Sequence, residues 1–598
     1  MTLEIAVHPL SPARSRPVVC RRPVIRVLAG LLLLIVSIGV FLPTYRHDFV
    51  HFDDQQQVID NPKIRSLSPG SLVEMFTSAS VDNYYPVRLL SFAVDYHFWG
   101  TEAGGYHLTN VLLHGANALL LFGLMLRLFG DRATGERGGH VWRKPGAALL
   151  GTLLFAVHPV VVEPVAWISG REELLMTFFG LLSIHGYVSA RRSERTGRRR
   201  WMLVGSMGMA ACALMCNVMA ASLPLILGGV EVAVFRPRRW ASPIWRLLPF
   251  GLLSGGAIVL ILMIESAHTE MILPHRLVEL EGIQRITVVP HVFWKNIQTL
   301  VWPKDLSLDY AEAVPASFMA PSVLLGMGAG VGVVWGLWLL RRHKAAMFGL
   351  LWTVAALAPS AQIFPHFYLR ADRYLYLPLA GVSLLLGAAL LGVMFSRLRL
   401  GWLIPVMVGV HLLALGWHSS AQALVWYDDQ TLFNHIIRVN PESEIAYNAL
   451  GLALEREGRT REAARKFEQA IEIAPDYGLA YNNLGTVYQK LGRMESAERA
   501  YRKAIEQHFD HPHVHSNLGH LLYDTGRYEE ALQHLNRALE AEPGLIQALY
   551  NKSLLLVDMG QPEQAAQYLR KILDLRPHLD LVAEELRRLE AHQRQHNR

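Results

Sequence analysis

Two adjacent acidic residues, Asp53 and Asp54, are the first candidates for chemistry in this sequence. They stand in the segment FVHFDDQQQVIDNP, a few residues beyond a long apolar run, so we expect them close to a membrane surface. A carboxylate at the mouth of an apolar cavity is suited to act as a general base, because desolvation and a neighbouring like charge both raise its pKa. The alternative is a helix N-cap or a solvated loop pair. On an extended loop only one of two adjacent side chains can face the cavity, and we slightly favour Asp54.

Three arginines near the ends of apolar runs, Arg88, Arg171 and Arg373, are candidates for binding an anionic group. A guanidinium can bond two oxygens of a phosphodiester at once, which suits it to a donor phosphate. The alternative for each is an anchor to lipid headgroups. Glu163 and His158 flank a Pro-rich turn between apolar runs, and we expect both to support such a site, with Glu163 a further candidate for contact with the donor.

A polar stripe runs along one apolar segment. Tyr106, Asn110, His114 and Asn117 are spaced by four, four and three residues, so on a helix they share one face. Polar faces inside a membrane point at protein partners or a cavity, and we add His107 and His114 to the donor candidates. No set of His, Asp and Glu has the spacing of a metal site, so we predict no definite cofactor, and a divalent cation remains open.

The composition indicates which elements must position these residues. Of 598 residues, 52% are hydrophobic and only 18% are charged, against about 25% charged in soluble domains. The apolar runs lie within residues 24–425, which we predict to be a transmembrane catalytic domain, and residues 426–598 read as a charged helical domain. The net charge of +7 comes from short Lys/Arg tracts between apolar runs, which argues against a nucleic-acid partner.

We predict about eleven transmembrane helices, since a bilayer core of about 30 Å needs roughly 17 to 25 apolar residues per span. The candidate spans are 24–44, 106–128, 145–162, 173–190, 201–216, 218–235, 246–265, 319–340, 345–363, 374–395 and 401–419. The mixed segment Arg285–Trp302 is assigned to the membrane interface. The predicted fold class is therefore all-α, a polytopic helical membrane bundle followed by a helical repeat domain.

The orientation follows from the Lys/Arg tracts, such as RRSERTGRRR at Arg191–Arg200, which gather on one side of the predicted membrane. That side is assigned to the cytoplasm, with residues 1–23 as a basic N-terminus. The outer side receives the first outer loop, 45–105, and after eleven crossings the tail. In a bacterial inner membrane the tail would be periplasmic, and in an ER membrane it would be luminal.

The tail repeats with a period of 34 residues. Gly458, Gly492, Gly526 and Gly560 share one slot of the period, and the pairs Leu450–Gly451, Leu484–Gly485 and Leu518–Gly519 share another. This pattern is typical of tetratricopeptide (TPR) repeats, in which small residues let paired helices approach closely. The predicted repeats are 444–477, 478–511, 512–545 and 546–579, followed by a capping helix at 580–594.

Asparagine recurs in one slot of the repeat. Asn483, Asn517 and Asn551 lie in the first helix of their units, which lines the concave face of a TPR array. An amide there can bond the backbone of an extended peptide, so these three are candidates for binding an acceptor in the TPR groove. The alternative is that they only cap helices or solvate the groove.

A series of motifs resembles the transmembrane-and-TPR-containing O-mannosyltransferase family and its bacterial relatives. In chain order these are DDQQQVIDNPKI, NYYPVRLLSFAVDYHFWG, GYHLTNVLLHGANALL, HPVVVEPVAWISGREELL, WPKDLSLDY and RADRYLYLP, and they are followed by the repeats. The resemblance implies a GT-C glycosyltransferase that takes a sugar from a lipid-phosphate donor in the outer leaflet. The acidic pair of the first outer loop is the family's catalytic hallmark, which maps onto Asp53 and Asp54.

The resemblance thus implies an inverting enzyme that moves mannose or another hexose from a polyprenyl phosphate to a protein or peptide hydroxyl. One departure stands out: bacterial relatives often have a Lys where this chain has Asn217, so other cationic side chains would have to bind a donor phosphate. Two alternatives remain, a GT-C enzyme that modifies a glycan or lipid, and a non-enzymatic scaffold whose TPRs dock an assembly.

Overall fold

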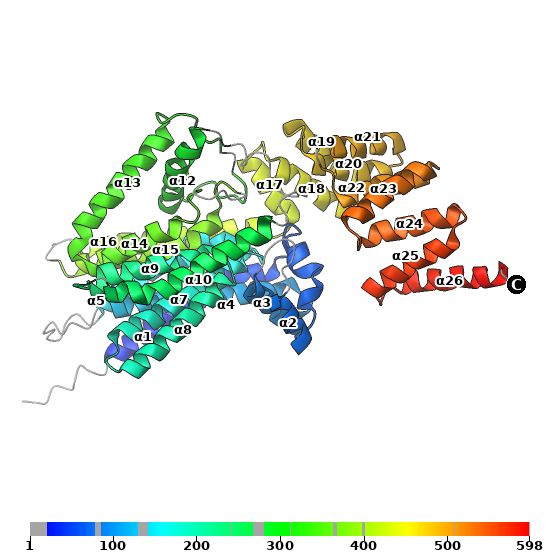
Figure 1. Ribbon diagram of the computed structural model, residues 1–598. Helices are drawn as coiled ribbons and strands as arrows, with labels where there is room; N and C mark the ends of the chain where they lie inside the picture. Colours follow the sequence, from blue (N-terminus) through cyan, green and yellow to red (C-terminus); the bar gives the residue numbers. More distant parts are fainter. Residues whose placement is uncertain are drawn as a thin grey trace, which may run out of the picture.

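The computed structural model describes residues 21–77, 85–129, 142–239, 241–266, 280, 282–310, 312–362, 368–396, 401–507 and 509–596. Every regular element among these residues is helical. Helices α1 to α16 form a membrane bundle with its outer elements, and α17 to α26 form an array beside it (Figure 1). The proposed cytoplasmic N-terminus lies outside the described residues except for its last three.

Each of the eleven predicted runs is helical. The helices are α1 (Arg21–Phe41), α4 (Ala103–Leu128), α5 (Arg143–Val157), α7 (Arg171–Arg192), α8 (Thr196–Leu214), α9 (Leu223–Val230), α10 (Ala241–Ser266), α13 (Pro321–Leu339), α14 (Lys344–Leu357), α15 (Tyr376–Met394) and α16 (Leu403–Ala423). In the described part of the chain, eight helical segments are long and apolar enough to cross a membrane, or nine if the pair Arg143–Val157 and Pro159–Ala166, bent by 52°, counts as one.

By length and composition alone, eight or nine of the described helical segments qualify as spans, against about eleven predicted from the sequence. Helix α14 has 14 residues and covers about 21 Å at 1.5 Å per residue, less than a bilayer core. Helix α8 begins in the arginine tract Arg198–Arg200, which leaves it a short apolar part, and it packs along α7.

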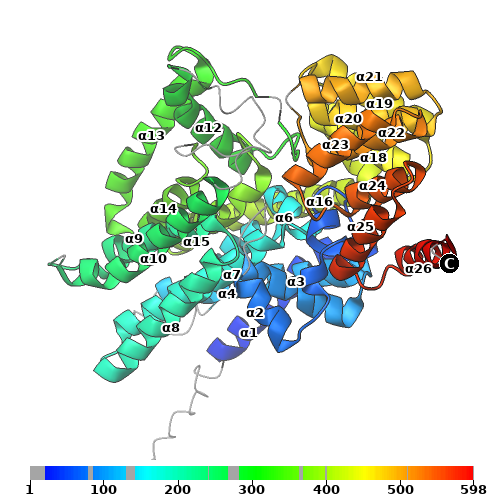
Figure 2. The ribbon, with the colours of Figure 1, turned by 45° about the vertical axis from the view of Figure 1, so that its right-hand side comes forward.

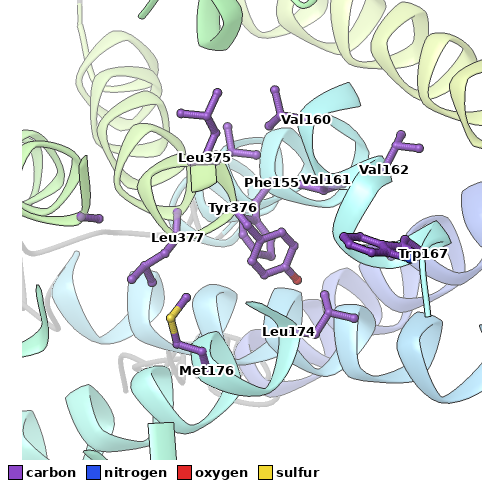
Figure 3. Packing of buried hydrophobic residues seen from close by; sticks show 14 of the residues in the cluster. Phe155, Val160, Val161, Val162, Trp167, Leu174, Met176, Leu375, Tyr376 and Leu377 are labelled. Atoms are coloured by element: carbon purple, nitrogen blue, oxygen red, sulfur yellow. The ribbon is translucent and has the colours of Figure 1, made fainter. Parts of the chain in front are cut away.

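The centre of the bundle is formed by α4, α5, α7 and α15. Figure 3 shows Phe155 of α5 and Tyr376 of α15 side by side in this apolar core, with Trp167 at its edge. Helices α5 and α15 approach closely because both have glycine at the crossing: a Cβ at Gly151 would lie 2.8 Å from the Cα of Gly387. This close contact packs the middle of α5 directly against α15.

Short elements at one end of the bundle form a second, smaller core. They include η2 (Leu42–Arg46), η3 (Gln55–Ile59), η4 (Pro62–Ile64), α2 (Pro69–Thr77), α3 (Pro86–Trp99), η5 (Pro159–Val161), α6 (Val162–Ala166) and η9 (Asp372–Leu375). Val58, Ile64, Met75 and Phe92 of the first outer loop pack together with Ile168, which follows α6. The acidic pair is thus carried on a loop with its own apolar support.

Helix α12 (Gln284–Val301), assigned to the interface from its mixed sequence, pairs with α13. Figures 1 and 2 show this pair standing away from the centre of the bundle. Pro290 lies within α12, and its carbonyl oxygen packs against Gly326 of α13 so tightly that no Cβ would fit there.

The tail consists of α17 (Asp429–Val439), four helix pairs and a last helix. The pairs are α18 (Glu444–Arg456) with α19 (Thr460–Ile473), α20 (Gly478–Lys490) with α21 (Met494–Glu506), α22 (Pro512–Asp524) with α23 (Tyr528–Ala541), and α24 (Ile546–Asp558) with α25 (Pro562–Leu575), followed by α26 (Asp580–His596). The four periodic glycines between paired helices have φ of 73° to 77°, which explains their recurrence. A Cβ at Gly485 would meet the Tyr501 ring at 2.6 Å, so the second glycine slot lets the paired helices touch.

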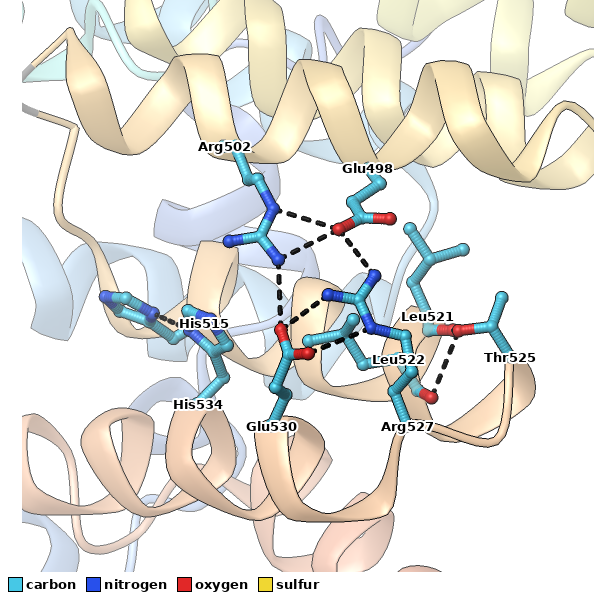
Figure 4. Close-up of polar contacts among 9 residues, drawn as sticks. All are labelled: Glu498, Arg502, His515, Leu521, Leu522, Thr525, Arg527, Glu530 and His534. Atoms are coloured by element: carbon cyan, nitrogen blue, oxygen red, sulfur yellow. Dashed lines mark hydrogen bonds and ion pairs between the residues drawn. The ribbon is translucent and has the colours of Figure 1, made fainter.

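Charged side chains also connect neighbouring repeats. Arg527 lies 2.8 Å from Glu498 and 2.5 Å from Glu530, and Arg502 bonds both carboxylates (Figure 4). These pairs are largely solvent-exposed, so each adds little to stability. The register of the array is set instead by its apolar core.

Candidate active site

Asp54 is held inside the protein by three hydrogen bonds. Its Oδ1 accepts from the backbone N (2.9 Å) and the hydroxyl (2.5 Å) of Ser169, and its Oδ2 accepts from the backbone N of Val50 at 3.0 Å. The side chain is only 1% exposed. Burial raises the pKa of Asp54 to about 7, although the bonds from Ser169 and Val50 act in the opposite direction. Asp54 therefore fastens the first outer loop to the turn between α6 and α7.

Asp53 lies in a different environment from its neighbour. It is half-buried and belongs to a run of turns that leads into η3, and Asp54 has helical dihedrals (φ −62°, ψ −27°), so the extended loop expected from the sequence is corrected. Burial chiefly raises the pKa of Tyr368, and the charges of Asp53 and Asp309 add to it while Arg373 opposes. Asp53 thus lies within electrostatic range of Tyr368, which belongs with Glu163 and Arg373 to one polar group at this end of the bundle.

Glu163 and Arg373 form a buried ion pair in that group. The Arg373 Nη1 lies 2.5 Å from Glu163 Oε1, and the backbone N of Arg373 donates to Oε2 at 3.1 Å. The guanidinium also lies over the rings of Trp167 and Tyr368. Two residues predicted separately from the sequence are therefore in direct contact, at the junction of α6 and η9.

The other two candidate arginines are also paired with carboxylates. Arg88 Nη1 lies 2.5 Å from Glu172, at the start of α7. Arg171 is fully buried, lies 2.6 Å from Asp95, and donates to Asn110 and to the backbone O of Tyr106. Arg171 therefore connects α3 and α4 to α7, which is a structural arrangement, and Arg88 joins α3 to the start of α7.

The polar stripe of α4 points into the bundle, as its spacing predicts. Asn110, His114 and Asn117 are fully buried. The Nδ1 of His114 lies 2.8 Å from the Tyr376 hydroxyl and its Nε2 lies 3.0 Å from the backbone O of Ala156, so His114 is enclosed in the core of Figure 3. The Nε2 of His107 lies 3.4 Å from the backbone O of Asp48, at the base of the first outer loop.

Asn217, where the sequence resemblance leads us to expect a lysine, lies beside a buried acid. Its Nδ2 donates to Glu173 Oε1 at 3.3 Å, and its Oδ1 accepts from the backbone N of Met219. Glu173 is buried at the start of α7. A lysine in place of Asn217 would thus face this carboxylate.

Sequence reasoning did not single out a second charged group farther out. Glu312, with an 8% exposed side chain, lies 2.8 Å from Arg370, 3.4 Å from Lys295 and 3.7 Å from His291. Burial raises the pKa of Glu312, but His291, Arg370 and Lys295 outweigh it and hold the pKa at about 2. The sequence could have pointed to Arg370, which belongs to the RADRYLYLP motif, but no motif marks Glu312.

Among the described residues, no group of three or more His, Cys, Asp and Glu side chains is arranged to hold a metal ion. A small space of about 10 Å³, enough for about one water, lies beside Glu163 and Asp372 and is bounded on its far side by Leu432 and His435 of α17. The polar group thus borders the repeat domain directly.

The three asparagines of the tail form a ladder between repeats. Asn483 donates to Asn448 at 2.9 Å, Asn517 donates to Asn482 at 3.0 Å, and Asn551 donates to Ser516. Each side-chain amide therefore donates a hydrogen bond to the preceding repeat. We call these three residues the asparagine ladder.

The fold and the site define a polytopic helical membrane protein in which a loop with an acidic pair lies beside a TPR array. Two relatives share the name Protein O-mannosyl-transferase. The chain is 35% identical over 205 residues to the mouse Protein O-mannosyl-transferase TMTC4, which covers 32% of this chain and 27% of that protein. It is 26% identical over 498 residues to the Drosophila melanogaster Protein O-mannosyl-transferase Tmtc3, covering 70% of this chain and 52% of that protein.

Family models described as tetratricopeptide repeat match residues 445–477, 476–541 and 510–578. A solved structure of Pseudomonas aeruginosa pilF is 32% identical, with a TM-score of 0.25, and covers 26% of this chain and 71% of that one. The repeat assignment is confirmed, and so is the resemblance to the TPR-containing protein O-mannosyl-transferase family. The matched segment spans only about a quarter, 27%, of the mouse and human relatives.

Proposed function

We propose that this protein is a membrane glycosyltransferase of GT-C type that transfers mannose, or another hexose, from a polyprenyl-phosphate donor to a hydroxyl of a protein or peptide. The relatives' shared name supports the reaction class. The observation that carries the proposal is the division of the acidic pair: Asp54 is buried and fixed by three bonds, whereas Asp53 is half-buried and lies within electrostatic range of Tyr368, which contacts Arg373.

Asp53 is the proposed general base. It takes the proton of the acceptor hydroxyl while that oxygen forms a bond to the anomeric carbon of the sugar. The bond between the anomeric carbon and the phosphate oxygen breaks, its electron pair leaves with the polyprenyl phosphate, and the anomeric configuration inverts. A base must lie within hydrogen-bond reach of the substrate. Asp54 is 1% exposed and is held against Ser169 and Val50, whereas Asp53 is half-buried, so exposure favours Asp53 over the residue preferred from the sequence.

Arg88 and Arg373 are the proposed residues for orienting the donor. Each guanidinium is already paired with a carboxylate, Glu172 or Glu163, and each has further N–H groups that can bond a phosphate or a sugar hydroxyl. Because both arginines are held by these ion pairs, they would not need to reorganise when charge develops on the leaving phosphate.

The proposed site faces the outer side of the membrane, which is the periplasm for a bacterial inner membrane or the ER lumen for a eukaryotic one. The TPR array is proposed to lie on the same side and to recruit the acceptor. A reporter fused after residue 425 should therefore be active outside the cytoplasm, and one fused after Arg195 should be active inside. Activity of the first fusion inside the cell would separate the array from the site.

The central experiment uses purified full-length protein in detergent with synthetic polyprenyl-phosphate-mannose and an extract of outer-compartment proteins. Mass spectrometry of the extract should find hexose on Ser or Thr, and Asp53→Asn should abolish most of it. Hexose only on glycans or lipids would favour a GT-C enzyme with another acceptor. No transfer from any lipid-linked hexose would favour the scaffold alternative and overturn the proposal.

A further inference from the structure

The base of the TPR array is bonded to the loop that carries the acidic pair. The backbone N of His51 donates to Asp429 Oδ1 at 2.8 Å, and His51 Nδ1 lies 3.0 Å from Asp429 Oδ2. Arg456 of α18 joins the same group, because its Nη1 lies 3.0 Å from Asp429 Oδ2 and its Nη2 donates to the backbone O of His51 at 3.4 Å. His51 precedes Asp53 by two residues, so these bonds hold the loop next to the proposed base.

Local sequence explains why Asp429 is available for this contact. Asp428 is the N-cap of α17 and accepts from the backbone N of Thr431 at 2.8 Å. Asp429 is therefore not needed for capping, and its carboxylate, 12% exposed, turns to the outer loop. Two more contacts strengthen the junction: Phe52 packs against Phe433 with centroids 6.3 Å apart, and Asp48 donates its backbone N–H to the backbone O of Tyr427.

The array base also holds the opposite side of the site. Asp309 Oδ2 accepts from the Ser443 hydroxyl at 2.5 Å and from Asn440 Nδ2 at 3.2 Å. The next residue, Tyr310, donates to Asp372 at 2.6 Å, and Asp372 directly precedes Arg373. The first helices of the array therefore contact both loops that bound the proposed site, one beside Asp53 and the other beside Arg373.

We propose that Asp429 is a positioning residue for transfer, and that α17 and α18 form one catalytic unit with the membrane domain rather than serving only to collect the acceptor. The proposal rests on the proposed function, and in particular on Asp53 as the base. The bond from the His51 backbone to a carboxylate is charge-assisted and partly shielded from water, so it resists screening better than an exposed ion pair. A displacement of about 1 Å at a catalytic group can cost about 100-fold in rate, so loss of the bonds between Asp429 and His51 should lower the rate of transfer.

The experiment compares Asp429→Ala, Asp429→Asn and Arg456→Gln with the matched control Arg570→Gln. Arg570 forms an ion pair of the same kind with Glu590, at 2.7 Å, but between α25 and α26 at the far end of the array. Turnover is measured with polyprenyl-phosphate-mannose, both with the acceptor found in the central experiment and with water as acceptor. We expect Asp429→Ala to lower kcat for both about 10- to 100-fold with an unchanged donor KM. Asp429→Asn, which keeps an oxygen for the His51 N–H, should lose less, and Arg570→Gln should match wild type.

Two readouts separate positioning from general destabilisation. In a double variant with Asp53→Asn, Asp429→Ala should cause almost no further loss, because no base remains to be positioned. Hydrogen exchange of the amides of residues 47–60 should speed up in Asp429→Ala and stay unchanged in Arg570→Gln. If Asp429→Ala does not fold, Asp429→Asn and Arg456→Gln carry the same comparisons.

Three results would overturn the inference. The first is near wild-type kcat in Asp429→Ala, and the second is a double variant whose kcat falls by the product of the two single fold-reductions. The third is unchanged hydrogen exchange in residues 47–60 of Asp429→Ala. Failure of the proposed function looks different, because wild type itself would then transfer no sugar. In that case the exchange measurement still decides whether Asp429 holds the loop.

Discussion

Replacing each member of the acidic pair by asparagine separates the base from the anchor. Asp53→Asn removes a group able to take a proton and leaves the shape of the loop intact. General-base catalysis contributes about 10²- to 10⁴-fold, so kcat should fall by that factor, which corresponds to about 2.7 to 5.4 kcal/mol of barrier. Donor binding and thermal stability should change little, because Asp53 is half-buried and the three bonds of Asp54 remain.

Asp54→Asn should act on the fold instead. An asparagine oxygen can still accept the two bonds from Ser169, but its amide would then face the N–H of Val50, and two donors would oppose each other. Leaving a buried donor without a partner costs about 1 to 3 kcal/mol, so the loop should loosen and the Tm should drop. Transfer should decline less than in Asp53→Asn when it is measured per folded molecule.

The assay is steady-state transfer from polyprenyl-phosphate-mannose, with Tm and the fraction of folded protein measured on the same samples. Asp53→Gln serves as a control for side-chain volume, and Gln56→Glu, an exposed neighbour, as a control for charge on the same loop. The reasoning is refuted if Asp53→Asn keeps near wild-type turnover while Asp54→Asn abolishes it without loss of stability. Asp54, with its pKa of about 7, would then be the base after local opening of the loop.

Three further predictions concern the rest of the chain. Alanine in place of all three residues of the asparagine ladder should raise the acceptor KM with little change in donor hydrolysis. It should also lower the Tm, since the ladder joins repeats. Equal loss of transfer and of donor hydrolysis would make the role of the ladder purely structural. Gly485→Ala should lower the Tm, because the new Cβ would lie 2.6 Å from the Tyr501 ring, whereas Gly544→Ala, with its nearest atom at 3.9 Å, should not. The pKa of Glu312 is depressed, so its stabilising effect is full above about pH 4.5 and is lost as the pH falls towards 2. The Tm difference between wild type and Glu312→Gln should therefore shrink over that range. A Tm difference that stays constant would contradict the assignment.

Local patterns predicted what depends on local periodicity. The eleven apolar runs are all helical, the stripe of Asn110, His114 and Asn117 points inward, and the periodic glycines adopt positive φ. Fewer of the described segments qualify as spans by length and composition than the sequence predicts, and α14 is one that falls short because it has 14 residues.

Long-range pairing could not be read from the sequence. Arg373 meets Glu163 across 210 residues, and Asp429 meets His51 across 378. Neither pair has a spacing signal, because each depends on which ends of helices meet in space. The difference between Asp53 and Asp54 is of the same kind, since it follows from a helical turn and from Ser169, a residue 115 positions away.

These long-range contacts make the site an assembly of separate segments held at few points. Asp54 attaches the first outer loop to the membrane bundle, and His51 attaches the same loop to the TPR array. The short segment between these two attachments contains Asp53, so the proposed base is positioned by both domains at once. Loss of either attachment should therefore lower turnover in the molecules that remain folded, and the two losses should not be independent, because both act through the same few residues of backbone.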